Sequence, residues 1–96
     1  MSKYVGLSTL EVLENAKNYN KWIADKILAH IEIPAMEIGA GIGNLTSYFL
    51  DKNPLYATDV DTELINRLKK KFKHKDIIID RLDIAKKIPN KYKFFF

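Results

Sequence analysis

A short apolar segment that runs directly into a glycine-rich turn is the feature that most constrains the fold of this chain. Residues 36–45 read MEIGAGIGNL, and a helical pattern follows them. Glycines at alternate positions allow the backbone to turn with positive φ values, and they allow a ligand to approach where a Cβ would collide. The free N–H groups of the next helix would point at the same place. The sequence therefore predicts a strand, a ligand-binding turn and a helix in succession.

The residues around the turn narrow the class of ligand. Glu37 precedes the turn, and a carboxylate there can accept hydrogen bonds from an ammonium or hydroxyl group, which would not suit a site for phosphate alone. A dinucleotide fingerprint, G-x-G-x-x-G/A, needs a small residue where Asn44 stands, and the third glycine comes one place early at Gly43. Half of a nicotinamide dehydrogenase is therefore a distant alternative.

The segment EIGAGIG at 37–43 resembles the first motif of class I S-adenosylmethionine-dependent methyltransferases, E/D-x-G-x-G-x-G. In that family the glycine loop carries the methionine part of the cofactor. The resemblance therefore implies that S-adenosyl-L-methionine is the cofactor and that Glu37 helps to bind it. The turn residues implied in binding are Gly39, Ala40, Gly41, Gly43 and Asn44.

An acidic pair follows a second apolar segment, residues 54–58, about 20 residues after the glycine turn. A carboxylate at the tip of a second strand can accept from both ribose hydroxyls, and either Asp59 or Asp61 could serve. The resemblance favours Asp59 for the ribose and Val60 for the adenine face. Asp61 would then be the N-cap of a helix over 62–73. The plainer alternative for Asp59 is a turn or helix-capping aspartate.

A third acid follows the β-branched run at 77–79, which suits a strand buried on both faces. The resemblance implies that an aspartate just past the third strand accepts from the adenine amino group, and Asp83 with Ile84 fall at that position. Asp80 lies nearer the strand and competes for the role, while Asp83 could simply cap a turn. The turn and the three acids occur in this order, each at a strand end. Together they indicate the methyltransferase family more specifically than any one of them does alone.

The order of helical and apolar segments predicts an α/β, Rossmann-like doubly wound sheet. We expect residues 1–33 to form an N-terminal helical segment and residues 34–96 to form the N-terminal half of a methyltransferase domain. The family's sheet has seven strands, of which this chain would supply about four, the last over 92–96. Three phenylalanines at 94–96 are not a usual domain end, which predicts a fragment that continues after Phe96. Such a fragment could pair with a C-terminal half or self-associate through its open sheet edge.

The first thirty residues predict an amphipathic helix that packs against the sheet. Ser8 or Thr9 is the expected N-cap, and the helix should end before Pro34. We expect Tyr19 and Trp22 to be core aromatics rather than a cover over the cofactor. The apolar positions recur at three- and four-residue steps and are Leu13, Ala16, Tyr19, Ile23, Ile27 and Ile31.

Charge is distributed unevenly along the chain. Residues 1–66 contain five lysines and nine acids, whereas residues 67–96 contain eleven lysines and arginines and three aspartates. The run KKKFKHK at 69–75 could contact nucleic acid, but it also lies in the last turns of a predicted helix, where cations are favoured. A solvated helix face is the interpretation that we prefer. The segment GIGNLT at 41–46 also resembles the first motif of ribosomal RNA adenine dimethyltransferases, so the methyl acceptor stays open between a small molecule, a lipid, a sugar and RNA.

The resemblance implies the S-adenosylmethionine-binding portion of a methyltransferase, which would transfer a methyl group to an unidentified acceptor when complete. No catalytic residue is assigned, because the family's acceptor-side residues commonly follow the fourth strand. We expect the fragment to be inactive alone, and a non-catalytic cofactor-binding remnant is an alternative. The chain departs from the family at Lys93, where an acid commonly stands.

Other classes of protein are disfavoured by what the sequence lacks. Without cysteine there is neither a disulfide framework nor a thiolate metal site, and we assign no metal ligand. There is no apolar run of membrane-spanning length and no signal-peptide core, so a cytoplasmic protein without a membrane span is expected.

Overall fold

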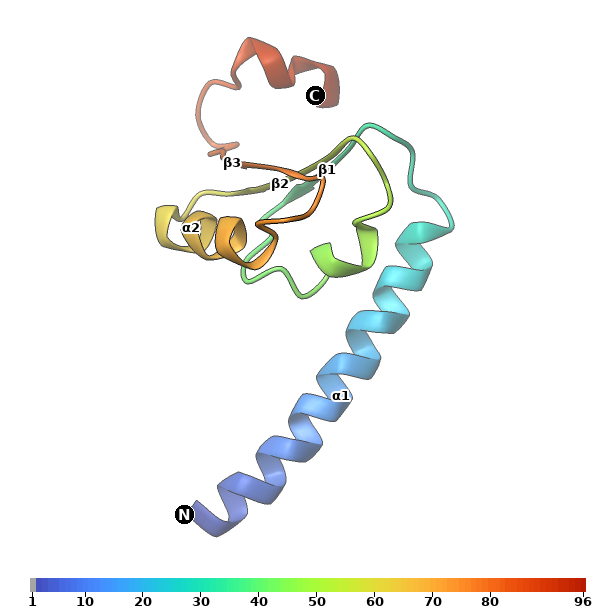
Figure 1. Ribbon diagram of the computed structural model, residues 1–96, viewed down its shortest axis with the longest axis vertical. Helices are drawn as coiled ribbons and strands as arrows, with labels where there is room; N and C mark the ends of the chain where they lie inside the picture. The colour runs from blue at the N-terminus through green and yellow to red at the C-terminus, as the bar shows by residue number, and fades with distance from the viewer. Residues whose placement is uncertain (1) are drawn as a thin grey trace. The chain divides into compact units, whose positions relative to one another are not determined.

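The computed structural model describes residues 2–96, with the side chains of Val12 and of residues 15–96. Two units, Met1–His30 and Ile31–Phe96, are considered separately. In chain order the elements are α1 (Ser2–Leu28), β1 (Ala35–Ile38), η1 (Thr46–Phe49), β2 (Leu55–Asp59), α2 (Thr62–Lys71), β3 (Ile78–Arg81) and η2 (Asn90–Phe95), where η denotes a 3₁₀ helix (Figure 1).

The first unit is the single helix α1. Its predicted N-cap at Ser8 or Thr9 is wrong, because the helix begins at Ser2 and both residues lie inside it. No proline precedes Ser8, so nothing in that stretch prevents the helix from extending upstream. Tyr19 and Trp22 stack on each other with ring centroids 6.1 Å apart, and their role as core aromatics stays a prediction because it depends on the packing of α1.

Two expectations about α1 are not settled. The side chain of Leu13 lies outside the described residues, and the packing of the helix against the sheet stays a prediction. No helix within residues 2–96 is both long enough and apolar enough to cross a membrane.

The second unit is built on a parallel sheet with the strand order β1-β2-β3. Residue pairs such as Ile38 with Thr58, and Asp59 with Arg81, fix the register. Because the strands are parallel, their carboxyl ends meet at one edge of the sheet, where ligands bind in α/β proteins. This arrangement confirms the prediction of an incomplete Rossmann-like sheet.

The helix α2 covers one face of this sheet and packs its apolar side chains against it. Ile65, Leu68 and Phe72 recur at helical spacing and pack around Ala57 of the central strand. At the start of the helix the Asp61 carboxylate accepts the N–H groups of residues 63 and 64 at 2.8 and 3.1 Å. The prediction that Asp61 is an N-cap is therefore confirmed.

The predicted fourth strand over 92–96 is wrong, because this segment forms η2 instead. Its own turns satisfy part of its backbone: the Tyr92 N–H donates to Pro89 O at 2.9 Å, and the Phe96 N–H donates to Lys93 O at 3.0 Å. A strand would need a neighbouring strand to pair these groups, whereas a 3₁₀ helix pairs them internally. Within this segment Tyr92 is buried, whereas Phe94 and Phe96 are exposed.

Tyr92 anchors η2 on the sheet. Its ring meets Tyr56 edge-on at 5.8 Å, and its hydroxyl donates to Asp80 Oδ2 at 2.6 Å. Tyr56 and Asp80 alternate with Ala57 and Ile79 in the register, so η2 lies on the sheet face opposite α2. Burial and the neighbouring Asp80 raise the pKa of Tyr92, so its hydroxyl keeps its proton and remains a donor.

Removing this hydroxyl should loosen η2. Tyr92→Phe leaves the ring in place but deletes the hydrogen bond to a carboxylate that is still partly solvated, so we expect the free energy of unfolding to fall by about 1 kcal/mol. Urea unfolding at neutral pH measures the change. Tyr48→Phe, at a half-buried tyrosine of η1, is the matched control. Equal effects from the two variants would contradict an anchoring role for Tyr92.

Candidate functional site

A cavity of about 190 Å³ lies at the carboxyl ends of the three strands. Each strand contributes the residues at or just after its end. The lining consists of Ile38 and Gly39 at the end of β1, Asp59 and Val60 at the end of β2, and Leu82, Asp83, Ile84 and Ala85 after β3. The structure thus brings together Gly39, Asp59, Val60, Asp83 and Ile84, which come from three separate loops of the sequence.

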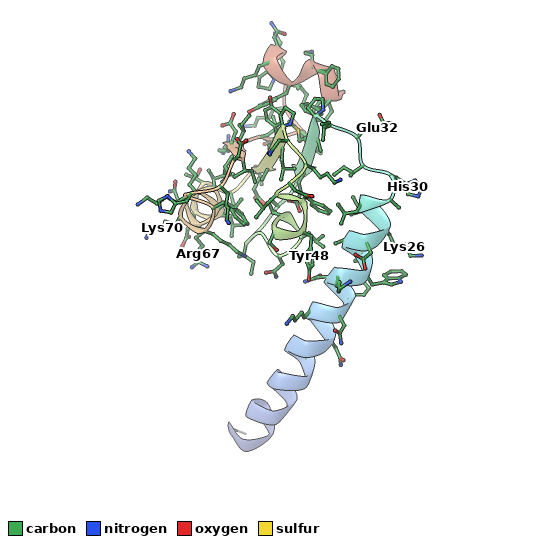
Figure 2. The ribbon with its side chains drawn as sticks, turned by 45° about the vertical axis from the view of Figure 1, so that its right-hand side comes forward. Lys26, His30, Glu32, Tyr48, Arg67 and Lys70 are labelled. Atoms are coloured by element: carbon green, nitrogen blue, oxygen red, sulfur yellow. The ribbon has the colours of Figure 1, made fainter. Side chains whose placement is uncertain are left out.

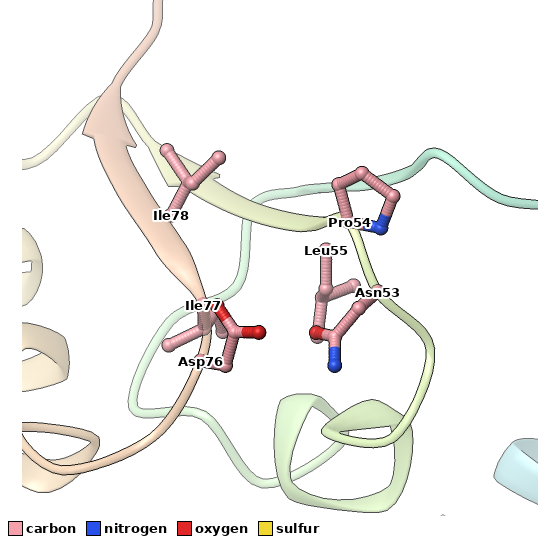
Figure 3. A pocket seen from close by; sticks show the side chains of 6 residues that line it. All are labelled: Asn53, Pro54, Leu55, Asp76, Ile77 and Ile78. Carbon is pink, nitrogen blue, oxygen red and sulfur yellow. The ribbon is translucent and has the colours of Figure 1, made fainter.

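A second pocket, of about 240 Å³, lies at the opposite ends of the strands. It is lined by Asn53, Pro54, Leu55, Asp76, Ile77 and Ile78 (Figure 3). Although it is larger, it lies at the amino ends of β2 and β3, where parallel sheets do not bind their ligands. The candidate site is therefore the smaller cavity.

The glycine turn has positive φ at all three glycines, +74° at Gly39, +62° at Gly41 and +86° at Gly43. A Cβ on Gly39 or Gly41 would meet no atom within 4 Å, whereas a Cβ on Gly43 would lie 2.8 Å from Phe72 Cε2. The first two glycines therefore leave open space, and the third allows close packing on α2.

Two other predicted turn residues have structural contacts of their own. Ala40 is buried in the core, and its N–H donates to Thr58 O at 2.9 Å. Asn44 is exposed, and its carbonyl oxygen accepts the Ser47 hydroxyl at 3.0 Å. Neither residue lines the cavity, so their role in binding stays a prediction.

Asp59 links the first two loops of the site. Its Oδ2 accepts the Gly41 N–H and its Oδ1 accepts the Asp61 N–H, both at 3.0 Å, and the residue is only 8% exposed. The Asp61 N–H, helped by the Gly41 N–H, lowers the pKa of Asp59 despite the burial, so the carboxylate stays charged at neutral pH. Each oxygen can accept a second hydrogen bond, so Asp59 can bind a pair of hydroxyls without losing its backbone contacts.

Glu37 lies near the carboxyl end of β1 but does not line the cavity. It is half-buried, and the buried Thr46 hydroxyl donates to its Oε1. Burial raises the pKa of Glu37, and the bond from Thr46 only partly offsets this. A nearby ammonium group would stabilise the charged form of such a carboxyl.

Glu37→Gln should alter how stability depends on pH. Since the folded pKa of Glu37 is raised, the stability from its neutral carboxyl is fully present below the ordinary value of 4.5 and is lost as pH rises through the folded pKa. Glutamine does not ionise, so the variant should lack this decline. Urea unfolding over a pH series measures it, with the exposed Glu32→Gln as control. Parallel curves of stability against pH for Glu37→Gln and the unchanged chain would contradict a raised pKa of Glu37 in the folded protein.

The structure separates the two acids that competed for the position after β3. Asp80 lies outside the cavity, bound by Tyr92 and by Lys91 Nζ at 3.0 Å, and the Tyr92 hydroxyl is the main cause of its lowered pKa. Asp83 lines the cavity, and its Oδ1 also accepts the Ala85 N–H at 2.9 Å. The turn-capping contact and the cavity position are therefore both present at Asp83.

Arg81 was not singled out from the sequence. Its Nε donates to Val60 O at 2.9 Å and so ties the loop after β2 to the end of β3. Val60 and Ile84 are each about half exposed at the cavity, which leaves two aliphatic surfaces beside the two acids. No group of three or more metal-binding side chains occurs among the residues that the structure describes.

No protein-family model matches the sequence, and no curated protein matches it. Solved structures do match the fold. An S-adenosylmethionine-dependent methyltransferase from Clostridium acetobutylicum ATCC 824 aligns with a TM-score of 0.61 and 21% identity, covering 93% of this chain and 37% of that one. The glycopeptide N-methyltransferase MtfA, complexed with S-adenosyl-L-methionine, aligns with a TM-score of 0.60 and 20% identity over 70% of this chain and 31% of its own.

A third structure, the DszA carbon methyltransferase, aligns with a TM-score of 0.54 and 17% identity, covering 76% of this chain and 24% of its own. The chain therefore spans between about a quarter and two fifths of the length of these proteins. At this level of identity the likeness concerns the fold. The chain has the Rossmann-like fold of S-adenosylmethionine-dependent methyltransferases.

Proposed function

We propose that this chain is the S-adenosylmethionine-binding portion of a methyltransferase. The observation that carries the proposal is the cavity at the strand ends, where an open glycine turn, a charged aspartate and a second aspartate converge from three loops. Paired hydroxyls, an amino group and an apolar ring are the features of an adenosine that such a lining can bind. The structural neighbours include an enzyme complexed with this cofactor, which supports the proposal.

The lining residues divide between the parts of the cofactor. Asp59 would accept from the ribose hydroxyls, Asp83 would accept from the adenine amino group, and Val60 and Ile84 would contact the faces of the ring. The glycine turn and Glu37 would hold the amino-acid tail. Small-molecule pockets commonly measure about 300–1,000 Å³, so the 190 Å³ cavity is small for a whole S-adenosylmethionine, and we assign the adenosine part to the cavity and the tail to the turn.

Bound S-adenosylmethionine would supply a methyl group on a sulfonium, which an acceptor attacks in line. The contribution of this chain is then to bind and orient the donor. Asp59 holds the ribose through a carboxylate already fixed by two backbone N–H groups, so little ordering is needed at the moment of binding. We assign no residue of this chain to the acceptor side.

Titration calorimetry of the chain tests the proposal. We expect S-adenosylmethionine and its demethylated product, S-adenosylhomocysteine, to bind with similar affinity, because the adenosine and the amino-acid tail are common to both. NAD should bind much more weakly, since the turn lacks the third small residue at Asn44. Comparable or tighter binding of NAD would overturn the assignment.

RNA is the acceptor class that one further observation favours. Lys69, Lys70, Lys73 and Lys75 are exposed near the carboxyl end of α2, and no ion pair forms at these four within the described part of the chain. Figure 2 shows Arg67 and Lys70 projecting from this helix. The helix dipole favours cations at this end of α2, and because the charges of this basic ridge are not neutralised by those ion pairs, an anionic partner such as RNA can bind them.

Removing three charges from this ridge tests the RNA acceptor. The triple variant Lys69→Gln, Lys70→Gln, Lys73→Gln should weaken binding of a labelled oligouridine by about tenfold at low salt and reduce the salt dependence, because fewer counterions are released. Fluorescence anisotropy measures both quantities. A control triple variant at Lys17, Lys26 and Lys52 has the same net charge. Equal losses of oligouridine affinity in the two variants would contradict a specific role of the basic ridge in RNA binding. Binding of the chain to anionic vesicles but not to RNA would indicate a membrane surface as the partner instead.

A further inference from the structure

The carboxyl end of α2 contacts the glycine turn through side chains. Lys71 Nζ donates to Ile42 O at 3.0 Å, although 29 positions separate the two residues in the sequence. Next to this contact, the side chains of Leu68 and Phe72 lie against Gly43, where even a Cβ would come within 2.8–3.0 Å of them. The glycine turn thus packs against the carboxyl end of α2.

Lys71 differs from the lysines around it. Its ammonium lies 5.5 Å from the centroid of the Phe72 ring, in the range of a cation–π contact, and donates to the turn at the same time. The four lysines of the basic ridge make no comparable contact with the turn among the described hydrogen bonds and ring contacts. The charge of Lys71 is therefore used within the protein.

The remaining hydrogen bonds of the turn come from its backbone. The Gly41 N–H is bound to Asp59, the Gly43 N–H donates to Ala40 O at 3.0 Å, and the Ser47 N–H donates to Gly43 O at 3.2 Å. Ile42 lies between two glycines, whose backbones have access to many conformations. A charge-assisted bond to the Ile42 carbonyl restrains the peptide unit at the middle of this flexible stretch.

We propose that Lys71 is a positioning residue for the amino-acid tail of the cofactor. By holding the Ile42 carbonyl, its ammonium keeps the turn in the conformation that leaves open space beside Gly39 and Gly41. A turn that is ordered before binding loses less conformational freedom when the tail docks, which raises the affinity. This inference rests on the proposed binding of S-adenosylmethionine and concerns only its tail, because the adenosine contacts come from β2 and β3.

Two ligands and two matched variants test the inference by titration calorimetry. S-adenosylhomocysteine has both adenosine and tail, whereas methylthioadenosine has the adenosine without the amino acid. Lys71→Met should weaken S-adenosylhomocysteine binding by roughly fivefold or more and leave methylthioadenosine within about twofold. Lys70→Met removes the same charge from the same helix and should change neither affinity. Lys71→Arg keeps a cationic donor and should restore most of the affinity.

The outcomes separate this inference from the proposed function. Equal weakening of both ligands by Lys71→Met would indicate a general structural defect and overturn the positioning role. If Lys70→Met had the same effect as Lys71→Met, the effect of Lys71 would be explained by net charge alone, and the positioning role would be overturned as well. If the unchanged chain binds both ligands and Lys71→Met binds each of them as tightly as the unchanged chain does, only this inference fails. If the unchanged chain binds neither, the proposed function fails first.

Discussion

Asp59→Ala is expected to weaken binding of S-adenosylhomocysteine by about 1.5–3 kcal/mol, roughly 10- to 150-fold, because a charged acceptor for two ribose hydroxyls is lost. The same substitution should lower the free energy of unfolding by about 1–3 kcal/mol. The N–H groups of Gly41 and Asp61 both donate to this carboxylate, and alanine leaves them without that acceptor. Titration calorimetry gives the first quantity and urea unfolding the second.

Two companion variants separate binding from stability. Asp59→Asn keeps one acceptor oxygen but removes the charge, so it should retain more stability than Asp59→Ala. Asp61→Ala removes the N-cap of α2 and should cost about 1 kcal/mol of stability with little loss of ligand affinity. A larger loss of affinity from Asp61→Ala than from Asp59→Ala would mean that the ribose role belongs to Asp61.

Gly43→Ala should lower the free energy of unfolding by about 2–5 kcal/mol. The left-handed backbone at φ +86° costs a residue with a Cβ about 1–2 kcal/mol, and the clash with Leu68 and Phe72 adds about 1–3 kcal/mol of overpacking. Urea unfolding measures the loss. Since both contacts are with the core, the effect should appear with or without ligand.

Gly39→Ala is the matched control for this prediction. It has the same backbone cost of about 1–2 kcal/mol, but its Cβ would meet no protein atom within 4 Å. Its stability should therefore fall less than that of Gly43→Ala, while its ligand affinity should fall because the methyl group enters space that we assign to the cofactor. Equal stability losses at the two glycines would contradict the packing of Gly43 on α2.

The parts of the site that follow from local sequence were predictable. A residue whose side chain accepts N–H groups two and three positions later can be recognised from spacing alone, as Asp61 was. The positive φ of Gly39 and Gly43 likewise follows from a glycine pattern directly after an apolar strand. The order of strands and acids indicated the fold, because parallel strands bring their carboxyl ends to one edge.

Contacts between distant segments were not predictable in this way. Arg81 binds Val60 O and Lys71 binds Ile42 O across 21 and 29 positions, and exposed basic residues carry no signal for such partners. The choice between Asp80 and Asp83 also depended on a distant residue, since the Tyr92 hydroxyl holds Asp80 on the sheet face outside the cavity.

The sequence by itself determined the three strands, the helix α2, the glycine turn and the acids at the strand ends, because each depends on neighbours a few residues away. It did not determine the helix expected directly after the glycine turn, where the structure has only the short 3₁₀ helix η1. Only the tertiary structure decided that residues 90–95 form a 3₁₀ helix, because a strand exists only if another strand pairs its backbone, whereas a helix of this kind pairs with itself. The tertiary structure also decided which of the predicted residues share one cavity. That outcome depends on the register of three strands and on the packing of α2 beneath the turn, which no single segment specifies.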